Sequence, residues 1–319
     1  EAVQARAGER IAAALPALLI LLSIGMLIAS WMLAGTIPFL VYWGVRLVRP
    51  DLLLLTAFAA TAVMSLCTGT SWGSAGTIGV ALMGMAAALD APLGAVAGAI
   101  VSGAYLGDKM SPLSDSTNIS AIGAGAPLYA HIRHMLFTAT PSLVAALLVY
   151  GVAGRVAAPG GAMPESARVL LAELDAVFSL HWLTLLPPVV VIACIVRRVP
   201  PVLAIAASSL VAVLIGVALQ GFPAPDAVAA AVAGVRAGML GAADTFSPAF
   251  VTLVQRGGLY SMATTLVVVI AAFLLAAAME ASGALHVLIE RLLGAVRSVF
   301  GLIAATMAAG STMIALTSH

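Results

Sequence analysis

The sequence has very little charge. Only 8% of its 319 residues are Asp, Glu, Lys or Arg, against about 25% in a typical soluble domain. Hydrophobic residues make up 62% of the chain, and the mean hydropathy is +1.14. This composition excludes a soluble globular domain and predicts a membrane protein that has the lipid bilayer as its partner.

Several residue types that build binding sites are also scarce. A net charge of +1 leaves no positive excess for phosphate contacts, so nucleic acid is excluded as a partner. The two cysteines, Cys67 and Cys194, lie in apolar runs without a CxxC spacing, and we expect both to be small core residues. The five histidines show no zinc spacing. The sequence predicts no cofactor.

Apolar runs account for most of the chain, at residues 11–33, 52–66, 78–89, 93–106, 135–152, 183–196, 202–219, 259–279 and 302–316. Several reach the roughly 20 residues that one crossing of a bilayer requires. Others are shorter and are interrupted by Gly, Ser and Thr, as in half-helices or re-entrant hairpins, whose free backbone groups must be buried. The predicted fold is an all-α polytopic membrane protein with broken helices.

Two landmarks recur along the chain at an offset of about 248 residues. Gly35 follows one long apolar run and Gly283 another, and Thr70 with Ser71 matches Thr317 with Ser318. Such weak symmetry is typical of inverted-repeat secondary transporters, whose substrate sites lie near the membrane midplane. The alternative is a chance alignment of helices that are both rich in Ala and Leu.

The repeat predicts three parts of the chain. Residues 1–154 form a first repeat with two polar helix breaks, the polar stretch 155–180 links the halves, and residues 181–319 begin a second repeat. Residues 1–10 are polar and resemble a loop between two helices, and the chain ends directly after an apolar run. We therefore expect a fragment that lacks the end of the second repeat.

The most informative polar segment lies between Gly103 and Gly125. Its candidate site residues are Asp108, Lys109, Ser111, Ser114, Asp115, Thr117 and Asn118. Lys109 is the only lysine of the chain and lies between the two carboxylates, with Pro112 in the middle of the segment. Ionisable groups at membrane depth cost at least about 2.5 to 3.5 kcal/mol each, so they persist mainly where function or pairing compensates. The alternative is a solvated surface loop.

Another polar break, earlier in the chain, runs from Cys67 to Thr77 and contains five hydroxyl side chains and three glycines. Its candidate site residues are Thr68, Thr70, Ser71 and Thr77. Glycine opens the helix, and carboxylate, hydroxyl and freed carbonyl oxygens together suit a small alkali cation. The alternative is a helix kink in which Ser and Thr only bond back to carbonyl groups.

A carboxylate in such a site can exchange sodium for protons. Poor solvation favours the protonated form, whereas a bound cation favours the ionised form. We predict that Asp108 or Asp115 is the exchanging carboxylate and binds sodium, with Lys109 pairing the other when the site is empty. Glu280 is a possible accessory group, but the sequence favours an interfacial cap at this position.

With these residues identified, the chain resembles the NhaC-type family of bacterial sodium/proton antiporters, within the ion-transporter superfamily. The resemblance rests on GTSWGSAGTIGVALMG (residues 69–84), SGAYLGDKMSPLSDSTN (102–118) and PLYAHIRHM (127–135). It implies an inverted-repeat fold, a homodimer, and exchange of sodium for protons across the bacterial cytoplasmic (inner) membrane. Some members exchange organic anions instead, such as malate for lactate.

Two other functions are alternatives to antiport. A sodium-coupled carrier of an organic acid or amino acid would use the same polar cluster, but no arginine is clearly placed to clamp a carboxylate. An intramembrane aspartyl protease is suggested by the motif YLGD at residues 105–108. That chemistry needs two carboxyl groups from different helices, so the sequence predicts a transporter and no enzyme.

Overall fold

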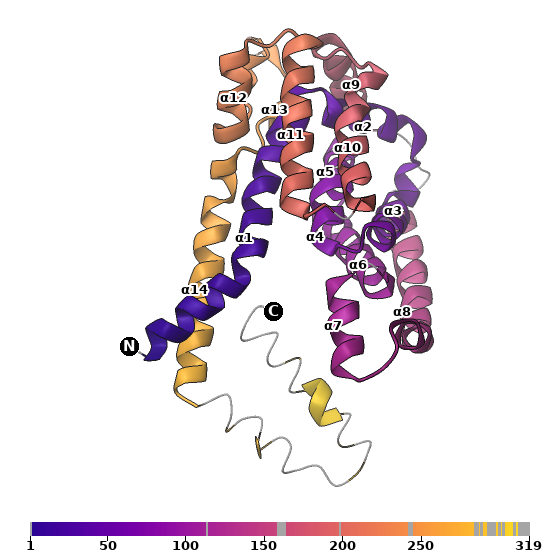
Figure 1. Cartoon of the computed structure of the whole chain (residues 1–319). Helices are drawn as coiled ribbons and strands as arrows, with labels where there is room; N and C mark the ends of the chain where they lie inside the picture. Colours follow the sequence, from indigo (N-terminus) through magenta and orange to yellow (C-terminus); the bar gives the residue numbers. More distant parts are fainter. Residues whose placement is uncertain are drawn as a thin grey trace. The chain divides into compact units, whose positions relative to one another are not determined.

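The computed structural model describes residues 2–112, 114–157, 164–197, 199–241 and 245–283, with short pieces between residues 287 and 311. These residues lie in helices, turns and irregular segments, and none of them is in a β-strand. The chain forms two compact units, Ser23–Ser261 and Glu1–Leu22 with Met262–His319. The all-α class predicted from the sequence is confirmed (Figure 1).

Three helices form the centre of the Ser23–Ser261 unit: α3 (Leu53–Thr68), α5 (Val80–Ala88) and α6 (Leu93–Met110). Phe58, Leu82 and Val96, one from each of these helices, are buried. α3 is preceded by a 3-10 turn, Pro50–Leu52, and α5 by the short helix α4 (Ser71–Ser74) and a π-helical segment, Ala75–Gly79.

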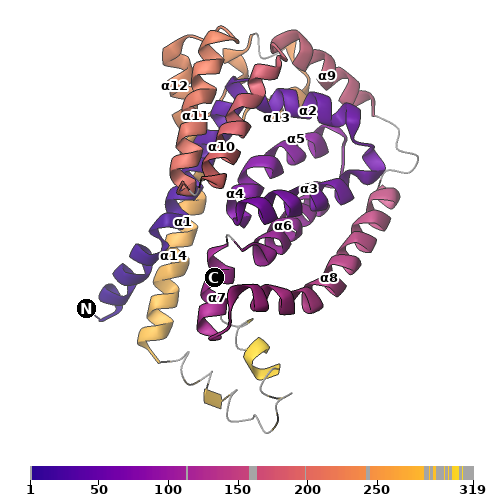
Figure 2. The ribbon, with the colours of Figure 1, turned by 45° about the vertical axis from the view of Figure 1, so that its right-hand side comes forward.

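The other helices of this unit are arranged around that centre, as Figures 1 and 2 show. They are α2 (Thr36–Leu47), α7 (Asp115–Gly123), α8 (Leu128–Ala157), α9 (Glu165–Val177), α10 (Leu186–Val196), α11 (Pro201–Ala218), α12 (Ala224–Ala233) and α13 (Pro248–Val254). Helix α1 (Ala2–Leu33) passes from one unit into the other, and α14 (Ala263–Ala281) belongs to the second unit. Further 3-10 turns cover Trp182–Leu185, Ala237–Met239 and Leu259–Met262.

Local signals explain many of the helix ends. Pro201 and Pro248 occupy first helical positions, where the missing N–H would have no partner in any case. The Ser247 side chain caps α13 by accepting a hydrogen bond from the Phe250 N–H at 3.2 Å. α3 ends at Gly69, whose φ of 69° lies in the left-handed region that favours glycine.

Two pairs of helices are bent sharply where they join. Leu18–Leu33 and Thr36–Leu47 meet at 73°, and Glu165–Val177 meets Trp182–Cys194 at 103°. Gly35, with φ of 76°, lies at the first bend. Neither bend was predicted from the sequence.

Hydrogen bonds connect these two bends to each other. The Thr36 hydroxyl donates to the Thr184 carbonyl oxygen at 2.6 Å. Gln220 Nε2 donates to the carbonyl oxygens of Ala34 and Ser179, at 3.1 and 3.0 Å, and its Oε1 accepts from the Ser179 N–H at 2.9 Å. These hydrogen bonds therefore link the two bends directly.

The described residues include four helices that are long and apolar enough to cross a membrane: Pro50–Thr68, Leu128–Ala157, Pro201–Ala218 and Leu259–Met279. Counting each bent pair as one span raises the number to six. Helices are also interrupted at both predicted positions, around Gly69 and between Met110 and Asp115. The chain is thus an all-α, multi-pass membrane protein.

Some details predicted from the sequence are wrong. Residues 2–10 are helical and do not form a loop, because good helix formers such as Ala, Gln, Arg and Glu lead directly into the apolar run. Cys67 is exposed and Cys194 half-buried, so neither is a fully buried core residue. α9 occupies half of the segment predicted to link the two repeats, and the boundaries of the repeats stay predictions. Thr317 and Ser318 lie outside the described residues.

Candidate functional site

The candidate site is built on the contact between α3 and α6, whose backbones touch. A Cβ atom on Gly103 would lie 2.2 Å from the Phe58 carbonyl oxygen, and one on Gly107 would lie 2.2 Å from the Ala62 carbonyl oxygen. Small residues permit this approach, as is usual between helices in membranes. The buried Ser65 hydroxyl also donates a 2.6 Å hydrogen bond to the Ala104 carbonyl oxygen.

The same contacts fix the relative direction of the two helices. Gly103 lies against residues 58–62 and Gly107 against residues 62–66, so the contact advances along both helices together. α3 and α6 therefore run in the same direction, and Asp108, one residue beyond Gly107, is level with the last turn of α3. The carboxyl-terminal ends of both helices, which carry partial negative charge, meet beside Asp108 and favour a cation there.

The first polar break returns the chain alongside α6. Gly79 lies against the Ile100 side chain, and the turn after α5 makes the segment 71–88 antiparallel to α6. Ser71 is eight residues before Gly79, and Asp108 is eight residues after Ile100. Because the two segments are antiparallel, Ser71 and Asp108 lie equally far along them from the contact between Gly79 and Ile100. The structure therefore brings Thr68, Ser71 and Asp108 to one level of the unit.

Hydroxyl groups within this first break bond mainly to each other and to nearby backbone. The Thr68 and Ser74 hydroxyls are 3.1 Å apart, and Ser74 Oγ donates to the Thr70 carbonyl oxygen at 2.9 Å. Thr77 Oγ1 donates to the Gly73 carbonyl oxygen at 2.6 Å, and Thr70 Oγ1 accepts from the Gly73 N–H. These bonds stabilise the break, as the kink alternative expected. A hydroxyl that donates keeps its lone pairs, so these bonds do not prevent cation binding.

One carboxylate oxygen of the candidate site is buried without a hydrogen bond. Asp108 Oδ1 is one of three such side-chain atoms among the described residues, with His131 Nε2 and Ser209 Oγ. An unpartnered buried carboxylate oxygen is costly, and each such atom calls for an explanation such as a bound ion. Lys109 is exposed, and no ion pair joins it to Asp108 in the described part of the chain.

The second polar break joins α6 to α7. Thr117 Oγ1 donates to the carbonyl oxygen of Lys109 at 2.9 Å, and Asn118 Nδ2 donates to those of Pro112 and Ser114, at 3.1 and 2.7 Å. Ser111, Ser114 and Thr117 are buried. These bonds hold the turn that follows Asp108, so Thr117 and Asn118 position the backbone beside the carboxylate.

Two predicted carboxylates have side chains outside the described part of the structure. Asp115 begins α7, five residues after the end of α6. Glu280 is in the last turn of α14, which belongs to the other compact unit. The roles of Asp115 and Glu280 stay predictions.

Sequence reasoning missed the polar face of α3. Thr61 and Ser65 of α3 are both fully buried, and so is Ser74 in the first break. The signal was present in the spacing, because Thr61 and Ser65 are four residues apart and lie on one face of a helix, facing Gly103 and Gly107. No group of three His, Cys, Asp or Glu side chains that could hold a metal ion occurs among the described residues.

Comparison with known proteins finds several antiporters that are similar in sequence to this chain. The chain is 42% identical over 312 residues to an uncharacterised Na+/H+ antiporter of Haemophilus influenzae, covering 98% of this chain and 66% of that protein. It is 36% identical to the Na+/H+ antiporter NhaC of Alkalihalophilus pseudofirmus (90% and 61% covered) and 34% identical to a malate-2H+/Na+-lactate antiporter of Bacillus subtilis (86% and 58% covered).

The chain thus spans about three fifths to two thirds of the length of these curated relatives. No solved structure matches it. The model of the Na+/H+ antiporter family matches residues 41–126 and 103–319, which include the whole α3–α7 region around Asp108. The chain therefore belongs to the Na+/H+ antiporter family.

Proposed function

We propose that the protein is a secondary active antiporter that exchanges sodium ions for protons across the bacterial cytoplasmic membrane. The observation that carries this proposal is the buried Asp108 Oδ1 without a hydrogen bond, at the level where α3 and α6 both end. The family of the chain and its relatives named as Na+/H+ antiporters support the same function.

Exchange follows from competition at one carboxylate. A proton and a sodium ion compete for the Asp108 carboxylate, because a protonated carboxyl group has no charge to hold the cation. Loss of sodium is then accompanied by uptake of a proton on the same group. Two ions that exclude each other from one site cannot be carried together, which is the requirement for antiport.

The hydroxyls of the first break would complete the sodium shell. Thr68 and Ser71 lie level with Asp108, and Thr70 and Thr77 keep lone pairs after their own hydrogen bonds. Ser111 and Ser114 are buried in the turn after Asp108. Asp115 is a second candidate carboxylate, and we propose that Lys109 pairs with it when the site is empty.

An inverted repeat would give this site a counterpart in the second half. α1 ends at Leu33 and α14 at Ala281, and in each case a glycine with positive φ follows two residues later, Gly35 at 76° and Gly283 at 71°. The two helix ends are separated by the same offset that relates the sequence landmarks. This equivalence supports the repeat, and homodimer formation stays a prediction.

A test uses everted membrane vesicles that contain the protein. Sodium added to vesicles with a proton gradient should release protons from the lumen, as reported by a fluorescent pH probe. Asp108→Asn should abolish this response, because an amide cannot exchange a proton for a cation. Asp226→Asn, an exposed change at the start of α12, should leave the response intact. Full activity in both Asp108→Asn and Asp115→Asn would refute the site.

A second function is favoured by one relative. The malate-2H+/Na+-lactate antiporter of Bacillus subtilis is 34% identical over 276 residues, so exchange of an organic acid coupled to sodium is the alternative. Sodium-dependent uptake of labelled malate or lactate, in vesicles that show no sodium-induced pH change without these acids, would favour it over simple Na+/H+ exchange.

A further inference from the structure

Helices α2 and α9 differ in direction from the helices to which they are joined. α2 lies at 73° to the preceding part of α1, and α9 lies at 103° to the segment Trp182–Cys194. If the joined helices cross the bilayer, α2 and α9 must run close to the membrane plane. Figure 2 shows both of them at the same end of the Ser23–Ser261 unit.

Each of the two helices has a buried apolar face and an exposed face. α2 buries Ile37, Val41 and Val45, and α9 buries Ala167, Leu170 and Leu174. On the exposed side of α2, Trp43 is 42% and Leu47 is 77% accessible, next to Arg46. Exposed tryptophan, leucine and arginine together on one amphipathic helix are typical of helices at the boundary between lipid headgroups and acyl chains.

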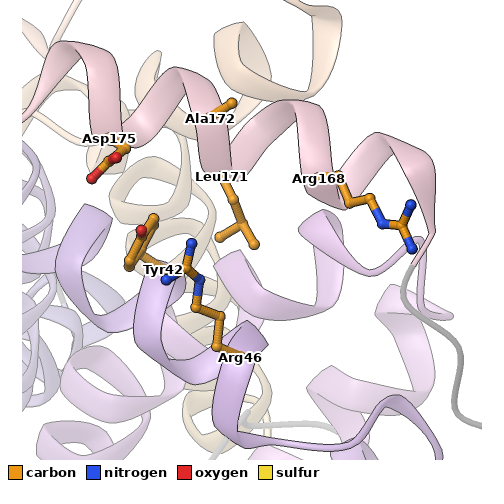
Figure 3. A pocket seen from close by; sticks show the side chains of 6 residues that line it. All are labelled: Tyr42, Arg46, Arg168, Leu171, Ala172 and Asp175. Carbon is orange, nitrogen blue, oxygen red and sulfur yellow. The ribbon is translucent and has the colours of Figure 1, made fainter.

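A cavity of about 390 Å³ lies between α2 and α9. It is lined by Tyr42, Arg46, Arg168, Leu171, Ala172 and Asp175. Figure 3 shows Arg46 reaching from α2 toward α9, while Arg168 and Asp175 lie toward opposite ends of α9. The lining thus carries two guanidinium groups and one carboxylate, which favours an anion.

Arg46 is held in a way that leaves its hydrogen-bond donors available. Its guanidinium carbon lies 4.0 Å from the centre of the Tyr42 ring and 5.9 Å from that of Trp43. Stacking uses the face of the guanidinium, while the N–H donors point outward from its edge. In the described part of the chain, Arg46 forms no ion pair with a carboxylate, whereas Arg168 pairs with Glu165 at 3.3 Å and Arg49 with Asp51 at 2.9 Å.

From this arrangement we propose that the cavity between α2 and α9 binds the phosphate group of an anionic phospholipid, with Arg46 as its principal ligand. A planar guanidinium binds a phosphate through two parallel hydrogen bonds. Trp43 and Leu47 lie beside Arg46 on the same helix, where the acyl chains of that lipid would pack. Arg168 adds positive charge at one end of the cavity, and Asp175 opposes binding at the other.

The experiment measures lipid binding to the whole chain in detergent micelles. Phosphatidylglycerol and phosphatidylcholine are supplied at equal concentrations, and bound lipid is counted by native mass spectrometry. Preferential retention of phosphatidylglycerol is expected. Arg46→Gln should weaken it by at least about tenfold, because the charged guanidinium that binds the phosphate is lost. Asp175→Asn should strengthen it, because the opposing charge is removed.

Arg155→Gln is the matched control, because it removes an exposed arginine at the end of α8 and none of the cavity lining. Equal losses in Arg46→Gln and Arg155→Gln would show non-specific attraction and overturn the proposal. Inorganic phosphate or methyl phosphate that displaces phosphatidylglycerol at comparable concentration would identify a soluble ligand instead. If Arg46→Gln does not fold, the sign of the Asp175→Asn effect decides: unchanged or weaker binding would contradict the site.

Discussion

The hydroxyl of Thr36 donates a 2.6 Å hydrogen bond to the carbonyl oxygen of Thr184, 148 positions away along the chain. Both residues lie directly beside sharp bends, one between α1 and α2 and the other before α10. Both are completely buried. This hydrogen bond and those of Gln220 connect the two bends, which share no sequence motif.

Thr36→Val should therefore destabilise the protein. Valine keeps the shape of threonine but leaves the buried Thr184 carbonyl oxygen without its donor, at a cost of about 1 to 3 kcal/mol. The measurement is thermal unfolding in detergent, followed by intrinsic fluorescence. Thr140→Val, on the exposed side of α8, is the control and should change the free energy of unfolding by less than about 0.5 kcal/mol.

Gly107→Ala should separate α3 from α6. The added Cβ would meet the Ala62 carbonyl oxygen at 2.2 Å, and overpacking of this kind typically costs about 1 to 3 kcal/mol. Gly98→Ala is the matched control on the same helix, because nothing lies within 4 Å of its Cβ position. It should stabilise α6 by up to about 1 kcal/mol. Equal unfolding temperatures for the two variants would contradict the close contact.

Glu173→Ala should loosen α13. Both carboxylate oxygens of Glu173 bind Ser247, one accepting from its backbone N–H and the other from its hydroxyl, each at 2.6 Å. Loss of hydrogen bonds to a charged group is expected to cost about 1.5 to 3 kcal/mol. Glu165→Ala removes an exposed carboxylate from the same helix and should cost less than about 1 kcal/mol. Hydrogen exchange of residues 248–254 provides the local measurement.

Sodium should stabilise the folded protein. A ligand at a hundred times its dissociation constant contributes about 2.7 kcal/mol to the free energy of unfolding. The unfolding temperature should therefore rise with sodium chloride but not with choline chloride at the same ionic strength. In Asp108→Asn the rise should disappear, and an undiminished rise in this variant would place the sodium site elsewhere.

The two polar breaks were predictable because they are local. Gly69 and Gly73 among hydroxyl residues, and Pro112 directly after Ser111, interrupt helices through their own backbone properties. The bends at Gly35 and before Thr184 were not predictable, because they depend on hydrogen bonds to residues that are distant in the sequence. Their partners, Thr184 and Gln220, lie 148 and 186 positions from Thr36 and Ala34.

The candidate site was predictable as a set of residues and not as an arrangement. Hydroxyls and carboxylates in short polar segments between apolar runs identified Asp108, Thr68 and Ser71. That α3 and α6 run in the same direction, so that both end beside Asp108, depends on how Gly103 and Gly107 pack against α3. Nothing in the sequence between these helices specifies that packing.

The close contact between α3 and α6 has a consequence for transport. No side chain separates their backbones at Gly103 and Gly107, and the Ser65 hydroxyl bonds directly to the α6 backbone. Sliding of one helix past the other would have to break that bond and drive each glycine over a carbonyl group. We therefore expect the pair to move as one rigid body, so that in the proposed exchange any motion that opens the site would carry Asp108 and Thr68 together.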